Sequence, residues 1–345
     1  PEGYCLVSFP ANVTKSAEIL WLDALEAEQI GDREAALELA KKVVHLDENH
    51  VDAWMGIAFF TLPVKNKGRQ KLPDLTESAI ALSAVRRVVK INPEHNRAWD
   101  LGGELLVDHL GMLEHALEWW EERRKISPRE VKPIIEQLSI LIRLGYYDAC
   151  ADLLDELYSD EIEIPETNRM IYKIENVRRM VERATRSEQN DIFSPQNPKG
   201  ERWEIIHRMK KRKPMSQTFF LLTFVAPIVF LLGSISMAFL GNTILGQVIV
   251  FILIIFLYFT INRLAMGMLH KLNRHALDLD RALDVETTSG KICIPEDVRG
   301  SKLYNSVIST RSPAFKERID VIHSSNERIS SKWELDIPFE ISAPF

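Results

Sequence analysis

Three patterns of hydrophobic and polar residues follow one another along the 345-residue chain. From residue 17 to about residue 188, apolar residues recur every three or four positions with polar residues between them, which predicts amphipathic helices. From Thr218 to Asn262 the chain contains no Asp, Glu, Lys, Arg or His. Helical spacing returns at Leu264 and then gives way to short apolar runs separated by turn residues. These patterns predict an all-α protein with an apolar hairpin in its second half and a short, mixed C-terminal segment.

The charge-free region consists of two apolar stretches, Thr218–Leu240 and Ile244–Ile261, separated by a short turn. A helix rises about 1.5 Å per residue, so roughly 20 apolar residues span a hydrocarbon layer of about 30 Å. A helix at the surface of a soluble core carries one apolar stripe, whereas these stretches are apolar on every side. We therefore predict a transmembrane hairpin at residues 217–263 and prefer it to a hairpin buried in a soluble core.

Basic residues flank both ends of the predicted hairpin. Five precede it, and others, including Arg263 and Lys271, follow it. Cationic segments beside membrane spans are retained on the cytoplasmic side, so we expect an integral membrane protein with two spans and both termini in the cytoplasm. A basic cluster can also bind nucleic acid, but its place directly before a span favours anionic lipid headgroups as its partner. The expected membrane-surface residues are Arg208, Lys210, Lys211, Arg212 and Lys213.

Helical segments recur with a period of about 34 residues in the first half of the chain. The sequence ALEAEQIGDREAALELAKKVVHLDENHVDAW contains two helical patterns joined by a Gly-Asp turn, and RRVVKINPEHNRAW and ERRKISPREV repeat its last part. Trp54 and Trp99 each open a helix, and Pro93 and Pro128 each follow one. Small residues stand where two helices must approach closely, namely Ala36, Ala81, Gly103 and Ala116.

This pattern resembles the tetratricopeptide repeat (TPR) over residues 17 to 160. Glu48 stands where the family pattern has proline, and Cys150 stands where it has alanine. Residues 62–76 hold an insertion that is polar, basic and bounded by prolines, so we expect a surface loop there. The resemblance implies a helical solenoid, closed by a capping helix from about Glu166 to Arg186. An irregular helical bundle is the alternative.

The resemblance also implies a concave groove, lined by the first helix of each repeat, where a partner protein or peptide binds. In this chain the lining has apolar residues at one end, an acidic middle, and a basic far end with Lys132 and Arg143. Apolar side chains provide contact area and acidic ones select cations, so we expect a ligand with apolar anchors followed by Lys or Arg. The alternative is that the large apolar residues pack internally. The candidate groove residues are Trp21, Leu25, Asp52, Met55, Phe59, Arg97, Asp100, Glu104 and Asp108.

Charge and cysteine content narrow the possible function classes. The net charge is −6, and residues 101–165 contain 15 Asp and Glu against 6 Lys and Arg, so this region would attract a basic partner. The three cysteines are far apart and no histidines cluster with them, which predicts no metal or other cofactor. No phosphate-binding glycine loop, nucleophile elbow or dinucleotide fingerprint occurs. Asp278 and Asp280 are expected to be solvated rather than catalytic.

The sequence therefore predicts a non-enzymatic, membrane-anchored scaffold or assembly factor that binds partner proteins through its repeat groove. An accessory structural subunit of a larger membrane complex is the alternative, and an enzyme with an active site at a subunit interface is a third reading that no residue supports. Five parts are expected: an N-terminal arm (1–16), the solenoid with its capping helix (17–188), a linker with a basic juxtamembrane helix (189–216), the hairpin (217–263), and an amphipathic helix with a cytosolic segment (264–345).

Overall fold

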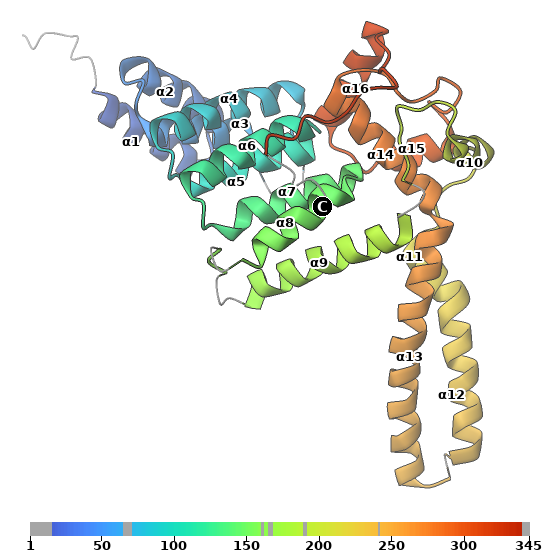
Figure 1. The fold of residues 1–345 in the computed structure, drawn as a ribbon. Helices are drawn as coiled ribbons and strands as arrows, with labels where there is room; N and C mark the ends of the chain where they lie inside the picture. The colour runs from blue at the N-terminus through green and yellow to red at the C-terminus, as the bar shows by residue number, and fades with distance from the viewer. Residues whose placement is uncertain are drawn as a thin grey trace, which may run out of the picture. The chain divides into compact units, whose positions relative to one another are not determined.

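The chain forms two units, each of which is built from helices (Figure 1). No strand occurs in the described part of the chain, so the predicted all-α class is confirmed. The N-terminal arm up to residue 15, the centre of the predicted surface loop (65–70) and the last six residues lie outside the described residues. The computed structural model describes residues 16–64, 71–159, 162–164, 168–188, 192–240 and 242–339. The first unit comprises residues 1–187, 312–321 and 335–345, and the second comprises residues 188–311 and 322–334.

Helices of the first unit follow one another as antiparallel pairs, and each helix from α1 to α8 packs against the next (Figure 1). This is the TPR-like arrangement that the sequence predicts. The helix α5 continues directly into a short π-helical segment, η1. The bounds are α1 Ala17–Gln29, α2 Arg33–Leu46, α3 Val51–Thr61, α4 Leu75–Ile91, α5 Asn96–Glu104, η1 Leu105–His109, α6 Leu113–Ile126, α7 Val131–Leu144, α8 Tyr147–Leu157 and α9 Asn168–Glu188.

Small residues allow the helices of this unit to approach one another. Ala36, Ala81 and Ala116 are fully buried at the positions predicted for helix crossings. At Gly103, an added Cβ atom would lie 2.3 Å from a ring carbon of Trp120, so only glycine fits beneath this indole. The sequence period is therefore set by steric requirements at the crossings as well as by hydrophobicity.

The turns that precede α3 and α5 are built alike. The indole nitrogen of Trp54 donates to the carbonyl of Glu48, and that of Trp99 donates to the carbonyl of Pro93, both at 2.8 Å. The aromatic residue that opens each first helix thus also fixes the preceding turn. A histidine ring nitrogen caps each helix, with His50 accepting from the Ala53 amide and His95 from the Ala98 amide, both at 3.1 Å.

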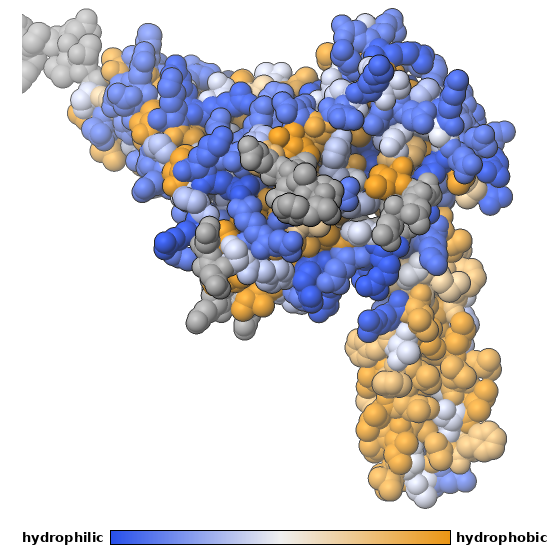
Figure 2. Space-filling model, in the orientation of Figure 1, coloured by the Kyte–Doolittle hydropathy of each residue, from blue (hydrophilic) through white to orange (hydrophobic). Residues whose placement is uncertain are grey.

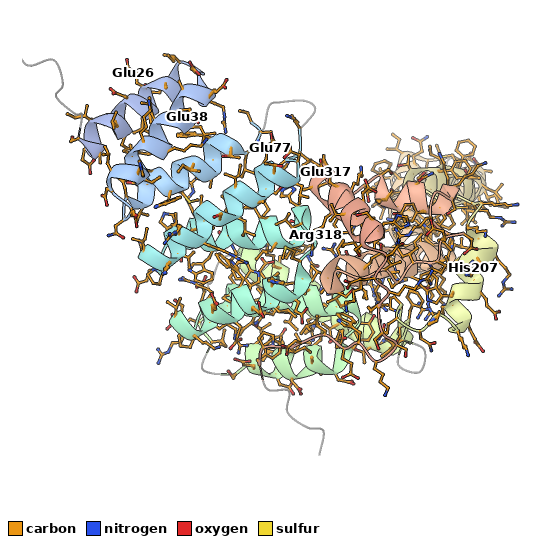
Figure 3. All side chains as sticks on the ribbon, turned by 90° about the horizontal axis from the view of Figure 1, so that it is seen from above. Glu26, Glu38, Glu77, His207, Glu317 and Arg318 are labelled. Carbon is orange, nitrogen blue, oxygen red and sulfur yellow. The ribbon has the colours of Figure 1, made fainter. Side chains whose placement is uncertain are left out.

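A C-terminal part of the chain also belongs to the first unit. The helix α16 (Pro313–Ser325) begins in this unit, and Figure 3 labels Glu317 and Arg318 on it. The Ser312 hydroxyl donates to the His109 carbonyl at 2.8 Å, and the Arg318 guanidinium donates to the Leu110 carbonyl at 2.7 Å. Burial lowers the pKa of Arg318 to about 10. The loop after η1 is therefore held by residues more than 200 positions away in the sequence.

The second unit has a buried core of its own. Trp203 is 1% exposed, and Leu279, Leu283 and Leu303 are fully buried. Trp203, which stands in the predicted basic juxtamembrane helix, is part of this core. The bounds are α10 Glu201–Met209, α11 Gln217–Phe220, η2 Leu221–Val225, α12 Ala226–Leu240, α13 Ile244–Leu272, α14 Arg274–Ser289 and α15 Lys302–Ile308.

Carboxylates on α14 are paired with arginines from other segments. Asp278, which we expected to be solvated, is 5% exposed and paired with Arg202, so that expectation is wrong. Asp280 is also paired, with an arginine 2.7 Å away. Neither partner is near in sequence, which is why a local pattern could not reveal the pairing. The ion pairs of α14 include Arg202–Asp278, Arg299–Glu286, Arg311–Asp280 and Arg311–Asp284.

Two long apolar helical stretches extend from this unit. Residues 217–240 and 244–272 contain 24 and 29 residues, and their most apolar 18-residue windows have mean hydropathies of 2.3 and 2.7, so both are long and apolar enough to cross a membrane. Figure 2 shows hydrophobic residues covering the visible face of α12 and α13. At the base of the pair, the Asn273 side chain accepts from the Met215 amide at 2.9 Å and donates to the Met215 carbonyl at 2.8 Å. This double hydrogen bond fixes where the first apolar helix begins relative to the end of the second.

Candidate functional site

A cavity of about 790 Å³ opens on the first unit, between the first helices of three successive repeats. Its lining includes residues from α1, α3, α5 and the loop after α3. The regular stacking of the repeats brings these residues together although the outermost, Trp21 and His109, are 88 positions apart in the sequence. Seven of the nine predicted groove residues line it: Trp21, Leu25, Asp52, Met55, Phe59, Arg97 and Glu104.

The apolar residues of this first cavity are partly packed and partly accessible. Met55 is 6% exposed, whereas Trp21 and Phe59 are half-buried. The Trp21 ring contacts Phe60, with ring centroids 6.3 Å apart, and Gly56 makes room for it because an added Cβ would lie 2.6 Å from the indole. The same side chains thus pack against one another and line the cavity.

Two arginines shape the first cavity. The Arg33 guanidinium donates to the carbonyl of Leu62 at 2.8 Å and also to the carbonyl of Phe59, which fixes the end of α3. The Arg97 guanidinium lies over the Phe59 ring, 4.9 Å from its centroid, in a cation–π contact. Sequence reasoning found Arg97 but missed Arg33, which follows a turn and has the pattern of a solvated residue.

A second cavity, of about 420 Å³, lies between α5, η1, α6 and α7. It is lined by the predicted residues Asp100, Glu104 and Asp108, and Glu104 also lines the first cavity. The two cavities therefore adjoin. The remaining lining residues are Gly103, Val107, Trp120, Lys132, Glu136, Ser139, Ile140 and Arg143.

Charge is distributed differently in the two cavities. The first is lined by three acidic and three basic side chains, apart from histidine, whereas the second has four acidic and two basic ones. Lys132 forms an ion pair with Asp100 at the rim. Burial raises the pKa of Glu136, which the cations of Lys173 and Lys132 lower only in part. Sequence reasoning missed Glu136 because the family's groove positions do not include it.

The five predicted membrane-surface residues lie in the second unit, at and after the end of α10. Lys210 is half-buried, and its ammonium group lies 2.7 Å from the Asp297 carboxylate. The hydrogen bond from Lys210 lowers the pKa of Asp297. The other four are exposed, namely Arg208, Lys211, Arg212 and Lys213.

The described residues contain no group of three or more His, Cys, Asp or Glu side chains that could hold a metal ion. Burial raises the pKa of Cys150 to about 12 and also raises that of Cys293 well above its usual range. Both thiols are therefore protonated at neutral pH, and neither has the character of a nucleophile.

Comparisons with known proteins add little to this geometry. No family model matches the chain, and no curated protein matches it in sequence. Among solved structures, a crystal structure of the MamA protein is similar at 15% identity and a TM-score of 0.29, covering 50% of this chain and 73% of that one. Residues 41 to the end of MamA from Desulfovibrio magneticus RS-1 match at 13% identity and a TM-score of 0.33, covering 52% and 99%. At these TM-scores the likeness carries no argument about function.

Proposed function

We propose that this protein is a membrane-anchored helical-repeat scaffold, held in a bilayer by the α12–α13 hairpin and binding a segment of a partner protein in the two adjoining cavities. The observation that carries the anchor is the exposure of the hairpin: only 17% and 11% of the most apolar windows of its two helical stretches is buried. A core helix of a soluble protein would be mostly buried, and an exposed apolar surface of this extent needs a cover. At about 1.5 Å per residue, 24 residues reach about 36 Å, enough to cross a hydrocarbon layer of about 30 Å.

The charges around the hairpin support an orientation with both chain ends in the cytoplasm. Four exposed basic residues precede the first apolar stretch, and Arg263 and Lys271 lie near the end of the second. Basic residues at span ends favour the cytoplasmic side and attract anionic headgroups. The residues that connect α12 to α13 would then lie on the far side of the membrane.

The groove supports a binding function rather than a reaction. The first cavity is lined by half-buried aromatic side chains and charged residues, and the second by charged residues beside the buried Trp120, which is the composition of a peptide-binding surface. We propose no chemical step for it.

The anchor is tested in membrane vesicles from expressing cells. Single cysteines are introduced at Asn242 in the turn and at Arg212 before the hairpin, in a Cys5→Ser background. We expect the protein to resist alkaline carbonate extraction, and an impermeant maleimide to label Asn242→Cys from the outside and Arg212→Cys only in inverted vesicles. Extraction at high pH, or labelling of both sites from one side, would refute the anchor.

An accessory subunit of a larger membrane complex is the competing function, because it too would cover the exposed hairpin. Exchanging residues 217–272 for an unrelated two-span anchor separates the two. A scaffold keeps its partner after the exchange, whereas a subunit that packs through its hairpin loses its complex. The readout is the set of proteins that remains bound, at constant ratio, through gel filtration in mild detergent.

A further inference from the structure

The second cavity has room for a cationic side chain and carries the charge to bind one. Its volume of about 420 Å³ falls within the range of ligand pockets. It lies between helices of the third and fourth repeats, with Trp120 and Ile140 as its apolar wall. Asp100, Glu104, Asp108 and Glu136 supply carboxylates, and Lys132 and Arg143 supply the opposing charges.

The existing ion pairs do not use all of these carboxylates. Lys132 is paired with Asp100. Asp108 and Glu136 accept no hydrogen bond and form no ion pair within 4.0 Å among the described residues. Glu136 faces Lys132 on its own helix, Lys173 on α9, Asp100 on α5 and Asp108 on η1, and its carboxyl is nevertheless held toward the neutral form by burial. A further cation in the cavity would stabilise the ionised form of both side chains.

An unpaired indole N–H is the second, independent observation. Trp120 is 3% exposed and lines the cavity, yet its Nε1 atom has no hydrogen-bond partner among the described residues. The neighbouring Trp119 is buried to a similar degree and donates to the Trp99 carbonyl at 2.9 Å. Buried indole groups normally find an acceptor. The edge of this ring faces α5 at Gly103, where an added Cβ would lie 3.2 Å from Nε1, so the α5 backbone packs closely against the indole but supplies no acceptor for it.

We propose that the second cavity binds a lysine or arginine side chain of the partner segment, with Asp108 and Glu136 facing the cation and the Trp120 indole donating to a carbonyl oxygen of the same segment. This inference rests on the proposed function, because it takes the apolar first cavity as the site for a neighbouring side chain of that segment. Glu104 lines both cavities, so the two ligand side chains lie close together in the bound segment. A peptide supplies both the cation and the carbonyl acceptor, which a metal ion does not.

The probes are short fluorescent peptides of Gly and Ser that contain one Phe and, two to five positions after it, one Lys. Matched peptides carry norleucine or Glu in place of Lys. Binding to the full-length protein in nanodiscs is followed by fluorescence anisotropy. We expect the best Lys peptide to bind about tenfold more tightly than its norleucine counterpart and the Glu peptide to bind weakest, because the cavity carries excess negative charge. Raising the salt concentration should reduce the difference in affinity between the Lys peptide and its norleucine counterpart.

Variants of the protein locate the effect. Asp108→Asn and Glu136→Gln should each weaken binding of the Lys peptide about threefold or more and leave the norleucine peptide unchanged. Glu118→Gln is the matched control, since Glu118 is an exposed carboxylate of α6 that lines neither of these two cavities. Circular dichroism verifies that each variant keeps its helices.

Each outcome decides the proposal. Equal binding of the Lys and norleucine peptides would overturn the cation site. If Leu25→Glu in the first cavity also abolishes the binding of both peptides, the apolar groove of the proposed function is retained. Binding of none of the peptides would overturn the cation site and the groove together, while the membrane anchor is decided separately by the vesicle labelling. Tighter binding of the Glu peptide would refute the charge assignment directly.

Discussion

Glu286 holds the loop after α14 in the second unit, and its removal should be the most costly single change there. Its side chain is fully buried. It accepts from the backbone amides of Cys293 and Ile294, both at 3.0 Å, and from the Arg299 guanidinium at 2.6 and 2.7 Å. The Arg299 side chain is itself only 10% exposed, so water cannot readily replace the carboxylate.

The magnitude follows from the groups that Glu286→Ala leaves without a partner. Breaking a buried ion pair by removing one member costs about 3–5 kcal/mol, because the other charge stays buried. Each of the two backbone amides that loses its acceptor adds up to about 1–3 kcal/mol where water does not reach it. Because these losses are not additive, we expect the free energy of unfolding to fall by about 5 kcal/mol. Glu286→Gln retains an oxygen for the amides but leaves the Arg299 charge without its counter-ion, so it should cost about 3–4 kcal/mol, less than the alanine variant.

The assay is urea unfolding of the full-length protein in mild detergent, together with amide hydrogen exchange of the peptide covering residues 291–299. Glu163→Ala is the control, because it removes the exposed pair with Arg129, both of whose side chains are 75% exposed, and should cost less than about 1 kcal/mol. The double variant Glu286→Ala/Arg299→Ala should be less destabilised than the sum of the single changes. The reasoning would be refuted if Glu286→Ala lowered the free energy of unfolding no more than the control does and left the amide hydrogen exchange of residues 291–299 unchanged.

Three further predictions concern the first unit. Gly103→Ala places a Cβ 2.3 Å from the Trp120 ring and should lower stability to urea by about 1–3 kcal/mol, whereas Gly267→Ala, with nothing within 4 Å, should cost nothing. Cys150, whose pKa burial raises to about 12, should react with iodoacetamide only after unfolding, and modification of the native protein in a mass spectrum would contradict this. Burial raises the pKa of Glu136 above its unfolded-state value, so its contribution favours folding at low pH and is lost as the pH rises through the folded-state pKa. Glu136→Gln should therefore raise the free energy of unfolding at pH 8 but leave it unchanged at a pH well below the ordinary glutamate pKa. An equal effect at the two pH values would contradict a raised pKa of Glu136.

Much of the first unit could be predicted because its determinants are local and repeated. The small residues at helix crossings and the tryptophans that open helices recur at a fixed spacing, and the structure places them where the spacing requires. Seven candidate groove residues line one cavity for the same reason, since a repeat carries each position onto the same face. Whether that face binds a partner stays a prediction, because a lining position does not identify its ligand.

The second unit could not be predicted in the same way, because its contacts join distant parts of the chain. Arg202 and Asp278 are 76 positions apart, and each taken alone has the pattern of a solvated residue. Trp203 lies in the predicted basic juxtamembrane helix, where no local pattern indicates burial, and it is 1% exposed. Residues 312–321 likewise belong to the first unit through buried apolar side chains and through hydrogen bonds to the distant backbone carbonyls of His109 and Leu110, which leave no period in the sequence.

The proposed scaffold binds its partner weakly through the groove alone, and the membrane anchor strengthens this binding. The first cavity has balanced charges and partly packed aromatic side chains, and the second offers two carboxylates for one cation, so a short segment gains only a few favourable contacts. Such contacts give modest affinity once the ordering of the segment is counted. Confinement to one membrane raises the effective concentration of a partner that is attached to the same bilayer, and linkage of this kind strengthens binding by a factor of about 10²–10⁴ without any new contact. A membrane-attached partner therefore suits this groove better than a freely diffusing one. The same lysine-containing peptide should bind more tightly when it is lipid-linked in the nanodisc than when it is free, and Asp108→Asn should weaken both forms by the same factor.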